Sequence, residues 1–141
     1  MLKLLYIIPI CLTSLLQAQS KKDNSILIPG NIPISKVKMV LFTNGYALDE
    51  NSDSMFIATQ PKELSRHFIA IKFLVAKTDT GTYLKGLWKE TQVYRTRGYQ
   101  TENEYTLLEY RKGLVGSTKV AWTEMEKIAK QLSDKLIYIR Q

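Results

Sequence analysis

Residues 35–59 read SKVKMVLFTNGYALDENSDSMFIAT, and this stretch decides how the chain begins to fold. Val37, Val40 and Leu41 recur at the spacing of one helical face, and the lysines between them lie away from it. Ser35 is the expected N-cap, because its hydroxyl can accept a hydrogen bond from a free first-turn amide. Gly45 suits the position just past a helix end, where a left-handed backbone is needed. We predict a helix here, with a strand as the alternative because several of its residues are β-branched.

The second half of this stretch predicts a hairpin. Residues 46–50 should be extended, Asn51–Ser54 is a turn cluster, and Met55–Thr59 is typical of a strand that Pro61 ends. Residues 61–66 then form a loop or a single helical turn. Asp49, Asn51 and Asp53 match the first ligand positions of a calcium-binding loop, but the required Gly and Glu are replaced by Ser54 and Gln60, which favours a solvated turn.

The clearest strand covers residues 67–77, where Ile69, Ile71, Phe73 and Val75 alternate on one apolar face. A short connection containing Gly81 predicts a hairpin back into a second strand over residues 83–94. Its alternation is less regular, so we expect a bulge near Gly86. A polar loop should cover residues 95–103, and residues 104–111 are typical of a further strand.

A long amphipathic helix is expected near the C-terminus. Its apolar positions repeat at three and four residues from Val120 to Leu132. Thr118 could cap it, or Thr123 could begin a capping box with Glu126. Residues 136–139 are either a last helical turn or a short strand. The predicted class is therefore α+β: a two-layer domain over residues 35–141, with an antiparallel sheet of about four or five strands and both helices on one face.

The N-terminus has the order of a secretory signal peptide. A basic start is followed by an apolar run over residues 4–16 and a region of small and polar residues. We predict a signal peptide over residues 1–18, and a flexible leader or edge strand over residues 19–34. The run is too short to span a bilayer comfortably, and no second such run follows, so no transmembrane anchor is expected. Export would place the protein in the periplasm or outside the cell, with the outer membrane as a further possibility. A lipidated Cys11 is the less favoured alternative, because Ile10 precedes it.

The sequence offers few groups for catalysis. The chain has 141 residues, one Cys, one His and a net charge of +7. Cleavage after residue 18 would remove Cys11, which excludes thiolate metal sites and Cys nucleophiles. His67 lies near Glu63, so a hydrolase is an alternative hypothesis, but a general base needs a positioned proton partner. We expect no enzymatic activity, no catalytic residue, no metal and no cofactor.

The strongest candidate for a binding surface is aromatic and basic. It comprises Tyr83, Lys85, Trp88, Lys89, Tyr94, Arg95, Arg97 and Tyr99. Such residues stack on bases and attract phosphates, but they are also the usual anchors of protein interfaces. Export argues against nucleic acid, so an envelope protein or a lipid-associated partner is the expected ligand. Two alternatives stay open: these aromatics complete the core, or the domain carries a small ligand or lipid in an apolar cavity under the C-terminal helix.

The order of these elements resembles a known family. A helix ending at Asn44-Gly45-Tyr46, then Asp53 and the strand Met55–Thr59, two long strands and a C-terminal helix are similar to the repeated domains of BamC. BamC is an accessory lipoprotein of outer-membrane barrel assembly. Over residues 35–132 the resemblance implies a helix-grip fold and a setting in the cell envelope. Gly45, Tyr46, Asp53 and Thr59 occupy the comparable positions.

Overall fold

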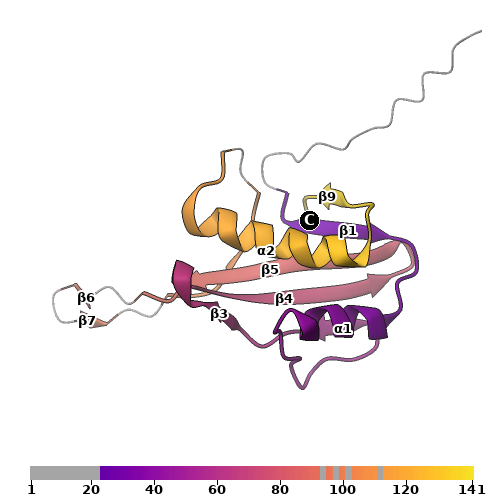
Figure 1. The fold of residues 1–141 in the computed structure, drawn as a ribbon, viewed down its shortest axis with the longest axis horizontal. Coiled ribbons are helices and arrows are strands. Elements are labelled where there is room, and N and C mark those ends of the chain that lie inside the picture. Colours follow the sequence, from indigo (N-terminus) through magenta and orange to yellow (C-terminus); the bar gives the residue numbers. More distant parts are fainter. Residues whose placement is uncertain (1–22, 93–94, 97–98, 101–102, 111–112) are drawn as a thin grey trace, which may run out of the picture.

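A computed structural model of the chain describes residues 23–92, 95–96, 99–100, 103–110 and 113–141. The expected signal peptide and Cys11 lie outside these residues. The described chain is an α+β structure with a seven-stranded antiparallel sheet, a separate two-stranded pair and two α-helices (Figure 1). The predicted class is confirmed.

Two long strands form the centre of the sheet. β4 (Ile69–Thr78) and β5 (Gly81–Glu90) pair over their whole length, from Ile69 opposite Glu90 to Thr78 opposite Gly81. Only Asp79 and Thr80 connect them, which is the tightest common hairpin loop. The predicted bulge near Gly86 is wrong, because Gly86 stands directly opposite Phe73 in an unbroken register.

Five short strands extend this hairpin on both sides. They are β1 (Ser25–Pro29), β2 (Phe56–Ala58), β3 (Lys62–Leu64), β8 (Thr106–Leu107) and β9 (Ile137–Ile139). β2 and β3 both pair with β4, whereas β1 and β8 both pair with β5, and β9 pairs with β1. The expected four or five strands become seven because β4 and β5 are each long enough to hold two short partners. β6 (Arg95–Thr96) and β7 (Tyr99–Gln100) pair only with each other.

β1 corrects the prediction of a flexible leader or edge strand. It lies between β5 and β9, and Ile26 and Ile28 are fully buried. Asn24 extends this contact: its Nδ2 donates to the Gln141 carbonyl oxygen at 2.9 Å, and its Oδ1 accepts from the Gln141 amide at 3.1 Å. Residues 25–29 are thus an integral part of the sheet.

The first helix, α1, covers Ile34–Thr43. Its N-cap is Pro33 and no side chain caps it, so the predicted cap at Ser35 is wrong. The predicted stop is confirmed, because Gly45 has φ +83°. The Gly45 amide donates to the Phe42 carbonyl and the Tyr46 amide donates to the Leu41 carbonyl, which together make a Schellman motif.

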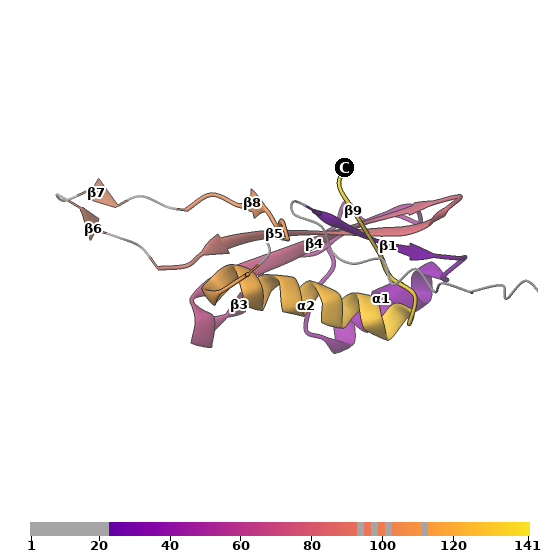
Figure 2. The ribbon, with the colours of Figure 1, turned by 90° about the horizontal axis from the view of Figure 1, so that it is seen from above.

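The second helix, α2, covers Gly116–Leu132 and begins earlier than its apolar pattern. Its N-cap is Val115, with no side-chain cap, so neither Thr118 nor Thr123 has the predicted role. The two helices contact each other, and both lie on the same side of the sheet (Figure 2). A 3-10 turn, η1 (Ser65–His67), precedes β4, which agrees in part with the predicted helical turn.

The core lies between this helical layer and the sheet. Its members are fully or almost fully buried and come from every layer: Ile26, Ile28, Val37, Leu41, Tyr46, Ile57, Ile69, Ile71, Phe73, Val75, Leu84, Leu108, Met125, Ile128 and Leu132. Gly86 contributes by its small size. A Cβ at this position would stand 2.9 Å from Leu108 Cδ2 and 3.3 Å from Met125 Sδ, so the glycine gives these two side chains their space.

Candidate binding surface

The register of the hairpin divides the sheet into two unlike faces. Residues directly opposite each other in antiparallel strands share a face. Ile71, Phe73 and Val75 therefore share one face with Trp88, Gly86 and Leu84, and this face meets the helices. The other face, which we call the open face, carries no α-helix within the described chain (Figure 2). Its residues on β4 and β5 are mostly only partly buried, whereas Ile71 and Phe73 are fully buried.

The open face combines lysines with apolar and aromatic side chains. Lys72 is opposite Leu87, and Leu74 is opposite Lys85. Phe56 and Leu107, from the neighbouring short strands, are 39% and 37% exposed, which is unusual for large apolar residues on a sheet. Such a surface can bury apolar area against a partner while its ammonium groups stay near the rim.

A tyrosine organises the lysines at one end of this face. Lys72 Nζ lies 4.6 Å and Lys89 Nζ 4.9 Å from the centroid of the Tyr105 ring. Both contacts are within the range of cation–π attraction. Partial burial, with a smaller contribution from the negative charge of Glu63, raises the pKa of the Tyr105 hydroxyl above its usual range. The Tyr105 hydroxyl can donate a hydrogen bond to a partner.

A groove occupies the other end of the open face. It has a volume of about 450 Å³. Its lining comes from β2, β4, β5 and the C-terminal residue: Phe56, Leu74, Ala76, Thr78, Tyr83, Lys85 and Gln141. We call it the Phe56 groove. We call Tyr105, Lys72 and Lys89 the Tyr105 cluster. The open face therefore carries both an apolar groove and a positively charged patch.

The structure brings together some of the predicted binding residues and separates others. Tyr83, Lys85 and Lys89 lie on the open face, as their shared parity with Leu87 requires. Trp88 does not: it lies on the helix face and packs against the core. Tyr94 and Arg97 are outside the described residues, and Arg95 and Tyr99 are described only as backbone positions of β6 and β7.

The predicted set of binding residues left out several members of the open face, among them Lys72, Phe56 and Tyr105. Lys72 was the one charge on the less apolar face of the clearest strand, and that was a usable signal. No local pattern in the sequence predicted that Phe56 and Tyr105 would lie on the same face as Lys72. Their positions depend on the pairing of β2 with β4 and on the chain that enters β8. Long-range pairing is not encoded in local periodicity.

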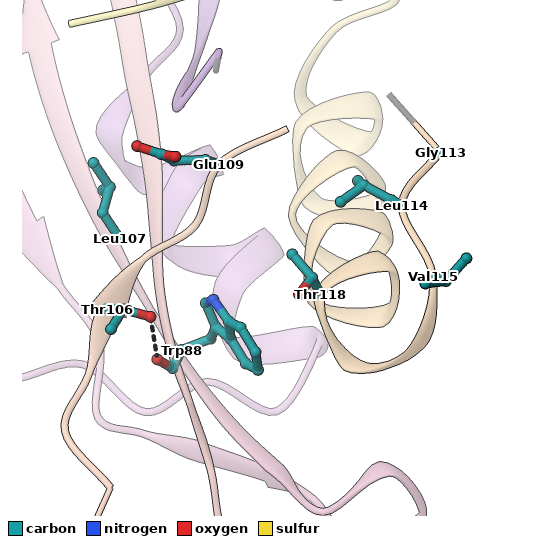
Figure 3. A pocket seen from close by; sticks show the side chains of 8 residues that line it. All are labelled: Trp88, Thr106, Leu107, Glu109, Gly113, Leu114, Val115 and Thr118. Carbon is teal, nitrogen blue, oxygen red and sulfur yellow. Dashed lines mark hydrogen bonds between the residues drawn. The ribbon is translucent and has the colours of Figure 1, made fainter. Parts of the chain in front are cut away.

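A second hollow lies on the helix side of the sheet, beyond the N-terminal end of α2. We call it the Trp88 pocket, and its volume is about 650 Å³. The residues that line it come from three parts of the chain: Trp88 of β5, Thr106, Leu107 and Glu109 at β8, and Gly113, Leu114, Val115 and Thr118 at the start of α2. In Figure 3 the Trp88 ring lies beside Thr118. The Thr106 hydroxyl donates to the Trp88 carbonyl oxygen at 3.4 Å.

The expected cavity under the helix itself would lie between residues 120–132 and the sheet. That space contains the side chains of Ala121, Trp122, Met125, Ile128 and Leu132, which are all buried. The Trp88 pocket lies instead at the start of α2, where Thr118 is its one lining residue from the helix.

His67 and Glu63, the residues of the alternative hydrolase hypothesis, lie close together in the chain around η1. Both are exposed, and they line a shallow hollow around η1 with Leu64, Ser65 and Arg66. Phe68 follows with φ +52°, an uncommon conformation for a bulky residue, and is 54% exposed. Across the residues that the structure describes, no three His, Cys, Asp or Glu side chains gather where they could hold a metal ion.

In the turn of residues 49–54, the side chains of Asp49 and Asp53 accept hydrogen bonds from nearby backbone amides. Asp53 Oδ1 accepts hydrogen bonds from the Met55 and Phe56 amides, each at 2.7 Å. These two bonds, followed by the charge of Lys38, hold the pKa of Asp53 below its usual value. Asp49 Oδ1 likewise accepts from the Asn51 amide at 3.2 Å. The carboxylates are thus turn formers, as the failed calcium motif indicated.

Comparison with known proteins gives no family for this chain. Within the described ranges, no helix has the length and apolar character needed to cross a membrane. No protein-family model matches the chain, and no curated protein matches it either.

Proposed function

We propose that this chain is an exported, non-enzymatic domain of the cell envelope or the secreted fraction, and that it binds a macromolecular partner through the open face of its sheet. Export is supported by the charged, apolar and small-residue order of residues 1–18. The binding role is supported above all by one observation: the open face holds exposed Phe56 and Leu107 beside three lysines and a groove.

The chemistry of the open face favours a particular kind of partner. Lys72, Lys85 and Lys89 repel a basic partner and attract carboxylates, so the partner is expected to be acidic along this surface. Phe56 and Tyr83 at the groove offer aromatic contact area, which is the usual anchor of a protein interface. The preferred partner is therefore an acidic protein segment that carries at least one large apolar side chain for the Phe56 groove.

The fold supports an envelope setting by resemblance only. The order of α1, a stop at Gly45, the β4–β5 hairpin and α2 is compatible with a helix-grip-like arrangement of the BamC kind. The likeness is one of element order and short motifs. We propose it as a classification of the fold, with the specific role in barrel assembly left to BamC itself.

Site-directed photocrosslinking tests the proposed surface. A benzoylphenylalanine at Tyr83 on the open face should give a discrete adduct in cells that express the chain, and the same probe at Met39 on α1 should not. The adduct should disappear in Lys85→Glu/Lys89→Glu and persist in Lys130→Glu/Lys135→Glu, which changes the charge equally on exposed residues elsewhere. Equal adducts at Tyr83 and Met39, or equal loss in both charge variants, would exclude the open face as the site.

A further inference from the structure

The Trp88 pocket exists because the start of α2 has no side chain to fill it. Leu108 and Met125 are fully buried, so they fill the space between α2 and the sheet where they lie. The next residue on the same face of β5 is Trp88, but the first helical turn above this region reads Gly-Ser-Thr. These small residues cannot cover an indole ring. The two layers therefore stay separated here, and the hollow in Figure 3 remains.

The loop into α2 completes the pocket wall. Gly113 and Gly116 have φ +79° and +61°, and a Cβ on either would meet nothing within 4 Å. Glycine is thus required at both by the backbone, not by crowding. These two turns carry Leu114 and Val115 to the pocket, where Val115 is 78% exposed.

We propose that the Trp88 pocket binds a small molecule that offers an apolar ring to Trp88 and Leu114 and a polar group to the threonines of the lining. A volume of about 650 Å³ lies within the usual range for ligand sites, roughly 300–1,000 Å³. Trp88 and Leu114 provide the apolar walls, and the Thr118 hydroxyl can exchange a hydrogen bond with one polar group of the ligand. Leu107 borders both this pocket and the open face, but Phe56 and the three lysines of the open face do not line the pocket, so different residues test the two proposals.

Fluorescence gives a direct test on the full 141-residue chain. The chain has two tryptophans, and Trp122 is 2% exposed in the core, so Trp122→Phe leaves Trp88 as the only indole reporter. We use N-phenyl-1-naphthylamine, a neutral apolar probe. It should bind saturably, with its own emission enhanced and that of Trp88 quenched by energy transfer.

Three variants decide where the probe binds. Leu114→Asp adds a charge to the pocket and should weaken binding at least tenfold, and Thr118→Leu fills the pocket and should do the same without loss of thermal stability. Phe56→Asp, on the groove of the open face, should leave the affinity unchanged. The proposal is overturned if the probe does not bind saturably, if both pocket variants bind it as the parent does, or if Phe56→Asp alone removes binding.

Discussion

The hydroxyl of Tyr46 donates a hydrogen bond of 3.1 Å to Oε1 of Glu124, across 78 positions of sequence. Tyr46 directly follows the stop of α1, and Glu124 lies in the middle of α2, so this bond joins the two helices. Lys62 of β3 adds a third partner: its Nζ lies 3.5 Å from the same carboxylate oxygen, 4.8 Å from the Tyr46 ring centroid and 2.7 Å from the Asn44 carbonyl oxygen. Tyr46 also packs edge-on against Phe73 at 4.8 Å.

Removing the Tyr46 hydroxyl should change how stability depends on pH. Burial, then the charge and hydrogen bond of Glu124, raise the pKa of Tyr46 far above its usual value of 10. This contribution to folding is fully present below pH 10 and is lost as the pH rises, because the unfolded chain ionises first. Tyr46→Phe should cost about 1–2 kcal/mol at pH 7. Above pH 10 the wild type should lose stability more steeply than the variant in urea titrations; parallel curves would contradict the argument.

Gly45 should be needed for its backbone conformation alone. A Cβ there would meet Lys62 Cε at 3.6 Å, which is an ordinary contact, so crowding contributes little. Its φ of +83° should nevertheless make Gly45→Ala cost about 1 kcal/mol. Gly45→Asn is the matched control and should cost less, because Asn tolerates the left-handed region. Thermal unfolding measures both, and a larger loss for Asn than for Ala would disprove this account.

Gly86 should be needed for the opposite reason. Its backbone is ordinary, but a Cβ would crowd Leu108 and Met125. Gly86→Ala should therefore cost about 1–3 kcal/mol, as overpacking of a core does. Leu108→Ala opens the same space, so the double variant should be more stable than the sum of the two single effects implies. Denaturant unfolding of all four proteins gives the coupling, and strict additivity would show that the two residues do not compete for space.

Trp88 and Tyr83 should behave differently although both are aromatic residues of β5. Trp88 packs against the core and is partly buried, so Trp88→Ala should cost about 2 kcal/mol, less than a fully buried Trp. Tyr83 lies on the open face, and Tyr83→Ala should cost under about 1 kcal/mol. Calorimetric melting temperatures compare the pair directly. If Tyr83→Ala proved the more damaging, the assignment of the two faces would be wrong.

Local patterns predicted the elements that depend on near neighbours. The alternation of Ile69, Ile71, Phe73 and Val75 correctly predicted β4 and its buried face. The three-and-four spacing that ends at Leu132 correctly predicted most of α2. Helix capping was predicted less well, since Pro33 and Val115 replace the expected Ser and Thr caps.

Elements that depend on distant partners were not predictable in this way. β3 and β8 are two or three residues long and exist because β4 and β5 extend past β2 and β1. The C-terminal tail becomes β9 because β1 offers it an unpaired edge. The open face was anticipated through Tyr83, Lys85 and Lys89, but its Tyr105 cluster needs β8 to lie beside β5.

The sequence by itself determined the α+β class, the β4–β5 hairpin, the amphipathic character of both helices and the end of α1 at Gly45. Each follows from side-chain period or from the backbone freedom of a single residue. Only the tertiary structure decided that β1 is an inner strand, that Trp88 faces the helices, and that Lys72, Lys89 and Tyr105 meet on the open face. These features depend on register between segments far apart in the chain, and a shift of one residue would exchange the two faces of a strand.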